Sequence, residues 1–518
     1  MRDRVAEKGS DTGADSARDS SADLRMDAGP GDARVDLARD SNADTADTAR
    51  DLLRDLPQDL SQDLPLDQTR DFPVRDTSME ASRDFPPVDL AAWETTADRP
   101  TDGKTDSTSA GDSAGSTLCV ATMAVCGGKT VNTSISIAHC GQCDSPCDPG
   151  SLCSAGICGP ATSHWPTFQH DVQHTGENPD EAGVPPLCLA WIRTLSPSTT
   201  VSPVAIQDGR LFVTLAARFS IEAPIYALNA SDGSDLWRYN FGDVSSIGHP
   251  SVFSGSVYLA NGKPTTGSAY LWAMDAVTGE IQWGAALAAQ WEQYWAPIRV
   301  GDIVYTNAGA YGGLYGIAAA DGAQVFFQSL DQYDQWSPGY FGDNIFTFIA
   351  GRFRKHDPAT GAILDTVLVL PSNVLTYAMQ TAPVFGPTLG YVISPPKLIA
   401  IDPATHDISW TAGGTFHGTP AVAGGTVYGI SAGTLQARDG ELGTLLWTFV
   451  GDTSLTYPPV VANGYVYVAS AKNVYAVDIA THEQVWADAV GGWLSLGAHK
   501  LFVASTDGTV RAYELSNP

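Results

Sequence analysis

A repeated unit of roughly 40 residues constrains this chain more than any other feature. In its clearest copy, residues 459–486, an apolar run leads to an Asn463-Gly464 turn, two alternating strands and a strand that closes on Trp486. Alternation of apolar and polar residues is the period of a β-strand, and glycine in the turns supplies a positive φ without steric cost. Each copy is therefore predicted to form a four-stranded antiparallel meander.

The copies share a tight turn followed by a closing aromatic residue. The turn glycine is replaced by His406 and His482 in two copies, which is tolerable because histidine is among the residues enriched at positive φ. The copy near Asp365 lacks the aromatic residue. The shared positions are Gly233, Gly279, Gly322, Gly361 and Gly443 for the turn, and Trp237, Trp283, Phe326, Trp410, Trp447 and Trp486 for the aromatic residue, which we interpret as a core stripe.

Stacking of such units predicts an all-β fold, an eight-bladed β-propeller over residues 161–518. One four-stranded sheet has two apolar faces and cannot bury both alone. The last copy ends one strand short at residues 511–515, and residues 189–193 look like a closing strand with no unit before them. The strand near 189–193 is therefore predicted to complete the last blade, which would join the ends of the ring and remove a free edge.

Residues 1–118 differ from the rest of the chain. They hold 27 acidic and 14 basic residues and only three aromatic ones. Such a segment buries too little apolar surface to offset its ordering entropy, so we predict a disordered Asp-rich spacer, with an acidic recognition or ion-binding tail as the alternative. The net charge of −29 argues against nucleic acid and anionic membrane surfaces as partners.

Residues 119–160 hold seven of the eight cysteines. This density predicts a small disulfide-rich module in an oxidising, extracytoplasmic compartment, although no secretory h-region follows Met1. No stretch is apolar for long enough to span a membrane. Eight cysteines allow 105 pairings, and the alternative is a zinc site at His139, Cys140, Cys143 and Cys147. The disulfide candidates are Cys119, Cys126, Cys140, Cys143, Cys147, Cys153, Cys158 and Cys188.

The run CGGKTVNT…HCGQCDSPCDPGSLCSAGIC resembles the cysteine-rich modules of stigma-specific (Stig1-like) proteins, which also occur in myxobacterial surface proteins. That pattern implies a further cysteine where Thr130 stands. The departure leaves seven cysteines in the module, so one is unpaired unless Cys188 reaches back to it.

The segment SHWPTFQHDVQHTGENP, residues 163–179, is called the lead-in here. His170, Asp171 and His174 could suggest a metal site, but Pro166, Gly176 and Pro179 disfavour a sustained helix, and we expect packing roles. Together with the Gly-then-Trp repeats, this motif resembles the PQQ-like (pyrroloquinoline-quinone-like) β-propeller family. Quinoprotein dehydrogenases and the BamB-like non-catalytic assembly factors are both members, so the resemblance implies a fold more strongly than a function.

Catalysis is not indicated by the residues of the repeats. A quinoprotein of that family would be expected to show adjacent cysteines, a calcium-binding set and a catalytic aspartate, and this sequence has no two adjacent cysteines and no calcium loop. We therefore expect no catalytic residues, no metal and no cofactor. The alternative is a PQQ-dependent dehydrogenase with a divergent site, holding PQQ with calcium.

A candidate binding site follows from prolines that begin the innermost strand of seven blades: Pro203, Pro250, Pro297, Pro338, Pro383, Pro420 and Pro459. Residues just before them are predicted to share one mouth of the central channel, with Glu292, Asp331 and Asp334 adding negative charge. Exposed aromatic rings there suit a protein, peptide or glycan partner, and packing between blades is the alternative. The candidate residues are His249, Tyr294, Trp295, Trp336, His417, Tyr457 and Trp493. The predicted function is that of a non-catalytic extracytoplasmic binding or scaffold propeller.

Overall fold

The computed structural model describes residues 122–148, 151–154, 156–160, 162–263, 268–288, 293–309, 312–369 and 378–516. The predicted disordered spacer, residues 1–118, lies outside them. The described residues belong to one compact unit, Asp106–Pro518. Within these ranges there is no helix of the length and apolarity that crossing a membrane requires.

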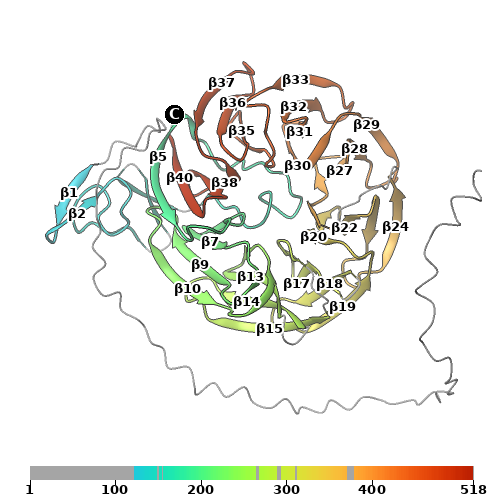
Figure 1. The fold of residues 1–518 in the computed structure, drawn as a ribbon, viewed down its shortest axis with the longest axis horizontal. Coiled ribbons are helices and arrows are strands. Elements are labelled where there is room, and N and C mark those ends of the chain that lie inside the picture. The colour runs from blue at the N-terminus through green and yellow to red at the C-terminus, as the bar shows by residue number, and fades with distance from the viewer. Residues whose placement is uncertain are drawn as a thin grey trace, which may run out of the picture. The chain divides into compact units, whose positions relative to one another are not determined.

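Eight four-stranded antiparallel meanders are arranged as the blades of a ring, as predicted (Figure 1). Blades are numbered along the chain, and strands run from the innermost to the outermost. Blade 1 has β6 (Ala205–Gln207), β7 (Arg210–Thr214), β9 (Pro224–Asn229) and β10 (Asp235–Asn240). Blade 2 has β12 (Ser251–Phe253), β13 (Ser256–Lys263), β14 (Ser268–Asp275) and β15 (Ile281–Ala288). Blade 3 has β16 (Ile298–Val300), β17 (Ile303–Asn307), β18 (Gly313–Ala318) and β19 (Gln324–Ser329). Blade 4 has β21 (Gly339–Phe341), β22 (Asn344–Ile349), β23 (Arg352–His356) and β24 (Ile363–Leu368).

The second half of the ring repeats this order. Blade 5 has β26 (Val384–Phe385), β27 (Gly390–Ser394), β28 (Lys397–Ile401) and β29 (Ile408–Ala412). Blade 6 has β30 (Phe416–Ala423), β31 (Thr426–Ser431), β32 (Thr434–Asp439) and β33 (Leu445–Phe449). Blade 7 has β34 (Val460–Ala462), β35 (Tyr465–Ala469), β36 (Val474–Asp478) and β37 (Gln484–Asp488). Blade 8 has β38 (Gly492–Gly497), β39 (Lys500–Ser505), β40 (Thr509–Ser516) and β5 (Val184–Thr194).

The ring is closed by β5, which contains residues 189–193 and pairs with β40 from the other end of the chain. Cα partners include Trp191 with Ala512 and Leu189 with Tyr513. Four short strands of the ring region lie outside the meanders. β8 (Arg218–Ser220) and β11 (Val244–Ile247) extend the blade 2 sheet, and β20 (Asp334–Trp336) pairs in parallel with β25 (Ala378–Thr381).

The cysteine-rich module consists of two hairpins, β1 (Met123–Cys126) with β2 (Lys129–Asn132) and β3 (Ser151–Ser154) with β4 (Ile157–Pro160). Disulfides join Cys126 to Cys143, Cys140 to Cys153 and Cys147 to Cys158. Cys188 is also disulfide-bonded, and Cys119 lies outside the described residues. The module touches blade 1, since the Cys153 N–H donates to Ser231 Oγ at 3.2 Å.

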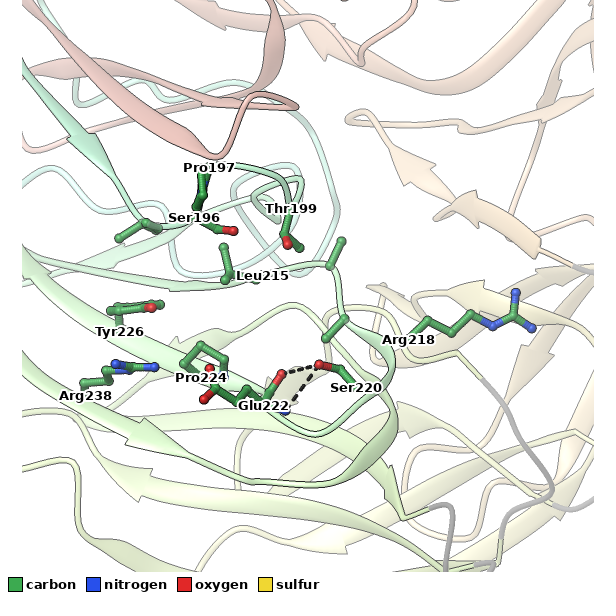
Figure 2. Close-up of a pocket in the computed structure, with 13 residues that line it drawn as sticks. Ser196, Pro197, Thr199, Leu215, Arg218, Ser220, Glu222, Pro224, Tyr226 and Arg238 are labelled. Carbon is green, nitrogen blue, oxygen red and sulfur yellow. Dashed lines mark hydrogen bonds between the residues drawn. The ribbon is translucent and has the colours of Figure 1, made fainter.

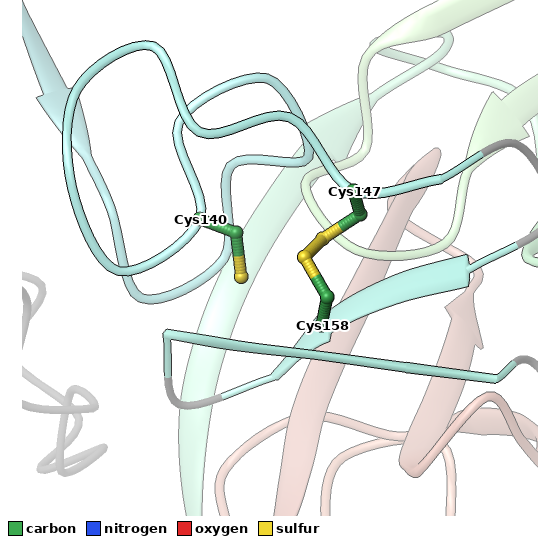
Figure 3. A group of neighbouring side chains, drawn as sticks. All are labelled: Cys140, Cys147 and Cys158. Carbon is green, nitrogen blue, oxygen red and sulfur yellow. A yellow bond between two sulfur atoms is a disulfide. The ribbon is translucent and has the colours of Figure 1, made fainter.

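The alternative zinc site is wrong, because Cys140, Cys143 and Cys147 are held in three different disulfides. The sulfur atoms of Cys140, Cys147 and Cys158 do lie within 4.8 Å of one another. Figure 3 shows the Cys147–Cys158 disulfide beside the sulfur of Cys140. Because Cys140 is itself bonded to Cys153, these three sulfur atoms are not a metal-ligand set. The predicted disulfide-rich character of this region is confirmed.

Neighbouring blades are joined by a clasp between the closing aromatic residue of one blade and the turn glycine of the next. A Cβ added at Gly443 would lie 2.5 Å from the Trp410 ring, so only glycine admits the indole, and its φ of +69° suits glycine as well. The indole Nε1–H of Trp410 donates to the Gly440 carbonyl at 2.7 Å. The same contacts join Trp191 to Gly233, Trp237 to Gly279 and Trp283 to Gly322, and Phe326 packs on Gly361.

The two histidine substitutions fall where the clasp differs. His406 of blade 5 faces blade 4, whose closing aromatic residue is missing, and its Nδ1 lies 2.8 Å from an oxygen of Asp365. His482 of blade 7 stacks on Trp447, with ring centroids 4.9 Å apart. Both histidines have positive φ, as predicted. An ion pair and a ring stack thus replace the indole-on-glycine contact at these two junctions.

A pH-dependent contact joins Glu181, just after the lead-in, to blade 8. The buried Glu181 carboxylate accepts a hydrogen bond from the His499 N–H at 2.8 Å and lies 3.4 Å from His499 Nδ1. This side-chain interaction raises the pKa of His499 above its ordinary value. The stabilisation is therefore complete below about pH 6.5, the unfolded pKa, and is lost as pH rises through the folded pKa.

We expect His499→Asn to cost more stability at pH 6 than at pH 8, with a difference of at most about 1 kcal/mol because His499 is partly exposed. Asparagine suits the positive φ of this position, so the substitution mainly removes the titrating ring. Urea unfolding of both proteins at the two pH values measures the difference. An equal cost at both values would contradict this assignment.

Candidate functional site

The lead-in crosses the centre of the ring, as the teal segment in Figure 1 shows, and forms hydrogen bonds with every blade. In chain order it reaches blades 8, 1, 2, 3, 4, 5, 6 and 7. The bonds are Ala498 N–H to Ser163 O, Trp165 N–H to Ile206 O, Val252 N–H to Pro166 O, Thr167 Oγ1–H to Pro297 O, Tyr340 N–H to Val172 O, Phe385 N–H to Gln173 O, Val422 N–H to Thr175 O, and Val461 N–H to Gly176 O. The innermost strands have no neighbour on the channel side, and the lead-in supplies partners there.

The polar side chains of the lead-in are used for packing and backbone hydrogen bonds. His174 is fully buried, and its ring nitrogens lie 2.7 Å from the Phe168 carbonyl and 2.9 Å from the Pro338 carbonyl. The Asp171 carboxylate accepts hydrogen bonds from the Gln173 and Thr175 N–H groups and from Thr175 Oγ1. The structure thus gives His174 and Asp171 the packing roles expected of them.

The seven candidate binding residues divide into two groups. Tyr294, Trp295 and Trp336 are at most 2 % exposed, whereas the other four are half-buried: His249, His417, Tyr457 and Trp493. All of them precede or begin innermost strands, so they lie at the same mouth of the channel. Because three of the seven candidate residues are buried, packing between blades, which was the alternative interpretation, accounts for the position of these three.

Four of the residues come together in one cluster, which we call the mouth cluster: His249, Trp295, Tyr457 and Trp493. Ring centroids lie 3.9 Å apart for His249 and Trp295, 5.7 Å for Trp295 and Trp493, and 5.1 Å for Tyr457 and Trp493. Phe168 of the lead-in packs edge to face against Trp295 at 5.3 Å. Three loops between blades and strand β38 thus each contribute one ring to a cluster that packs on the lead-in.

The remaining three residues do not join the mouth cluster. Trp336 packs with blade 3 and blade 4 residues, and its Nε1–H donates to the Tyr333 carbonyl at 2.8 Å. Tyr294 belongs to the core between blades 2 and 3. His417 lies in β30, with its Nδ1 3.4 Å from the Thr415 carbonyl. Sequence position alone places these residues at the mouth, but which way each ring turns depends on the local connection.

Two polar atoms of the mouth cluster have no hydrogen-bond partner among the described residues, the indole Nε1 of Trp295 and Nδ1 of His249. Burial lowers the pKa of His249 to about 3, so its ring is neutral at pH 7. An unsatisfied buried donor or acceptor costs about 1–3 kcal/mol. A ligand with complementary polar groups would therefore form hydrogen bonds with these two atoms and remove that cost.

The acidic residues expected at the mouth behave differently from one another. Glu292 lies outside the described residues. Asp331 forms ion pairs with Arg352, at 3.3 Å, and with Arg354, so its charge is compensated. Burial raises the pKa of Asp334, whose carboxylate accepts a hydrogen bond from the Gln293 N–H. Asp334 forms no ion pair with any described residue, although the Arg218 charge acts on it.

A polar cleft of about 500 Å³ adjoins the mouth (Figure 2). Residues 195–199, between β5 and β6, form one wall, and residues 215–224, between β7 and β9, form the other. Arg238 lies in the cleft with its guanidinium 5.2 Å from the Tyr226 ring. Arg218 points away from the cleft in Figure 2, and it interacts electrostatically with Asp334. Sequence reasoning missed this cleft, and the long β7–β9 connection was the available signal.

The packing of the mouth cluster does not fit a flat quinone held between two aromatic faces. Trp295 meets both Phe168 and Trp493 edge to face, at interplanar angles of 76° and 70°, so protein rings occupy the positions that a sandwiched cofactor would need. The described cysteines are all in disulfides within residues 126–158 or at Cys188. Among the described residues, the cysteines expected near PQQ therefore lie away from the mouth cluster.

Comparison with known proteins identifies two families. The model described as outer membrane protein assembly factor BamB matches residues 189–337, 350–454 and 451–517. The stigma-specific STIG1-like protein family matches residues 97–161. A search of curated proteins found no match.

Solved structures share the propeller fold. BamB from Moraxella catarrhalis is 21% identical with a TM-score of 0.52, and the match covers 63% of this chain and 99% of that one. Quinohemoprotein alcohol dehydrogenase ADHIIG from Pseudomonas putida HK5 is 13% identical, with a TM-score of 0.52 and coverage of 68% and 80%. The quinohemoprotein alcohol dehydrogenase from Comamonas testosteroni is 14% identical, with a TM-score of 0.52 and coverage of 69% and 81%. At these identities the likeness concerns the fold alone.

Proposed function

The chain belongs to the family of the outer membrane protein assembly factor BamB, and we propose that it is a non-catalytic binding propeller whose protein, peptide or glycan partner docks on the mouth cluster. One observation carries the proposal. The half-buried rings of His249, Tyr457 and Trp493 lie around Trp295, whose buried Nε1–H has no partner among the described residues. Rigid aromatic surface beside an unsatisfied donor suits recognition of a partner that carries both apolar surface and acceptors.

Binding is favoured over catalysis by the packing at the centre of the ring. The lead-in occupies the channel, and the edge-to-face rings above it do not fit a flat cofactor. PQQ-dependent oxidoreductase activity is the competing function, and the dehydrogenases among the solved relatives are the reason to test it. The disulfides of the cysteine-rich module support an oxidising, extracytoplasmic location.

We expect Trp493→Ala and Tyr457→Ala each to weaken partner binding at least about 10-fold, the effect of removing a central aromatic anchor. Binding of the wild-type chain to arrays of peptides and glycans, followed by affinity measurement on each hit, provides the test. Phe327→Ala is the matched control, because Phe327 is an exposed ring on outer strand β19, away from the mouth. Hits that bind both mouth variants as tightly as wild type would contradict the proposal.

A further inference from the structure

A second cleft, of about 380 Å³, lies at the opposite end of the channel from the mouth cluster. Its rim includes Phe341, Gly386 and Gly424, which follow or end the innermost strands of blades 4, 5 and 6. The prolines of the mouth precede those same strands or, in blade 6, lie within one. The two ends of the innermost strands thus open onto two separate sites, with the lead-in between them.

The cleft has apolar walls. Phe341 and Phe385 stack with ring centroids 5.2 Å apart and an interplanar angle of 8°, and Val422 and Ala423 also line the cleft. A Cβ added at Gly424 or Gly425 would meet nothing within 4 Å, so this side of the cleft is open to an incoming group.

One carboxylate lines this apolar cleft, that of Glu177 on the lead-in. No hydrogen bond or ion pair to its oxygens joins it to another described residue, although Gln173 and Thr175 line the same cleft. Burial raises the pKa of Glu177, and the nearby Asp171 charge raises it further, while His170 lowers it. A carboxylate that is desolvated without a cationic partner is destabilising unless a partner arrives from outside.

We propose that this cleft receives the cationic head of a lysine or arginine side chain from a protein partner. The head would pair with the Glu177 carboxylate, the aliphatic stem would lie along Val422 and Ala423, and the Phe341 ring offers a cation–π contact. Charge complementarity favours a basic partner, since residues from Cys119 onward hold 31 acidic and 15 basic residues. This site is independent of the mouth cluster.

The test uses the full chain with blocked arginine amide and blocked lysine amide as probes, followed by saturation-transfer NMR. Blocked citrulline amide is the neutral counterpart of arginine. Both cationic probes are expected to bind, with Glu177→Gln weakening them at least five-fold, while Glu483→Gln, on an exposed turn of blade 7, leaves them unchanged. Trp493→Ala is also expected to have no effect, which separates this proposal from that for the mouth.

Folding of the key variant is checked by its melting temperature. Glutamine has the shape of glutamate without its charge, so Glu177→Gln should melt at the wild-type temperature or above it at pH 7. Equal binding of citrulline amide, or unchanged binding by Glu177→Gln, would overturn the proposal. Binding of spermidine more than ten-fold tighter than both amino-acid probes would also overturn it, because the occupant would then be a free amine rather than a protein side chain.

Discussion

Asn178→Ala is expected to lower the free energy of unfolding of the ring by about 2–4 kcal/mol. Asn178 is fully buried where the lead-in meets blades 7 and 8. Its side-chain amide lies 2.8 Å from the Leu496 carbonyl, 2.9 Å from the His164 carbonyl and 3.1 Å from Ser163 Oγ. Alanine would leave buried acceptors without a donor, and each such group costs about 1–3 kcal/mol.

Urea unfolding at pH 7 measures this loss. Asn344→Ala is the control, since Asn344 is the partly exposed first residue of β22 and its amide donates only to the carbonyl of Gly342 in the adjacent turn, and its cost should stay within about 0.5 kcal/mol. Equal costs for the two variants would contradict the role given to the lead-in as the element that ties the innermost strands together.

The double variant Asp365→Trp with His406→Gly is expected to rebuild the standard clasp between blades 4 and 5. Asp365→Trp alone should destabilise by about 1–3 kcal/mol, because the ion pair would be lost and His406 would keep the indole from the position that Trp410 takes on Gly443. In the double variant the indole can lie on a glycine, as Trp410 lies on Gly443. The pair should then be more stable than Asp365→Trp by at least about 2 kcal/mol.

Thermal and urea unfolding of the wild type, both single variants and the double variant give the coupling energy of this cycle. His406→Gly alone should change stability by less than about 1 kcal/mol, since it removes a partly exposed ion pair and places glycine at positive φ. Additive effects would show that Asp365 and His406 do not form one junction, and would contradict the account of how the blades interlock.

Much of the fold could be predicted because the same sequence pattern occurs in every copy of the repeat. Strand alternation, turn glycines and closing aromatics recur in each copy, so the eight sheets do not depend on any one of them. The closing strand was detectable because residues 189–193 resemble the last strand of a unit that has no earlier strands. The sequence also showed that Asp365 and His406 break the pattern, but their contact depends on the spatial adjacency of blades 4 and 5.

The candidate site was less predictable, because a mouth position does not determine side-chain direction. Trp295 and Trp336 both precede a proline by two residues, yet Trp295 joins the mouth cluster and Trp336 packs between blades. The path of the lead-in could not be predicted either. Its bonds join residues up to 335 positions apart, as between Ser163 and Ala498, and no local pattern records which carbonyl faces which strand. The cleft at Glu177 depends on that same path.

The most direct test of the central claim, that this propeller binds rather than catalyses, is a titration of the full chain with PQQ and calcium. Tryptophan fluorescence reports binding, and dye reduction with simple alcohols and sugars reports turnover. The account predicts neither saturable quenching nor dye reduction, because protein rings fill the centre of the mouth. Saturable quenching that is lost in Trp493→Ala, together with turnover, would contradict it and make the mouth cluster a cofactor site.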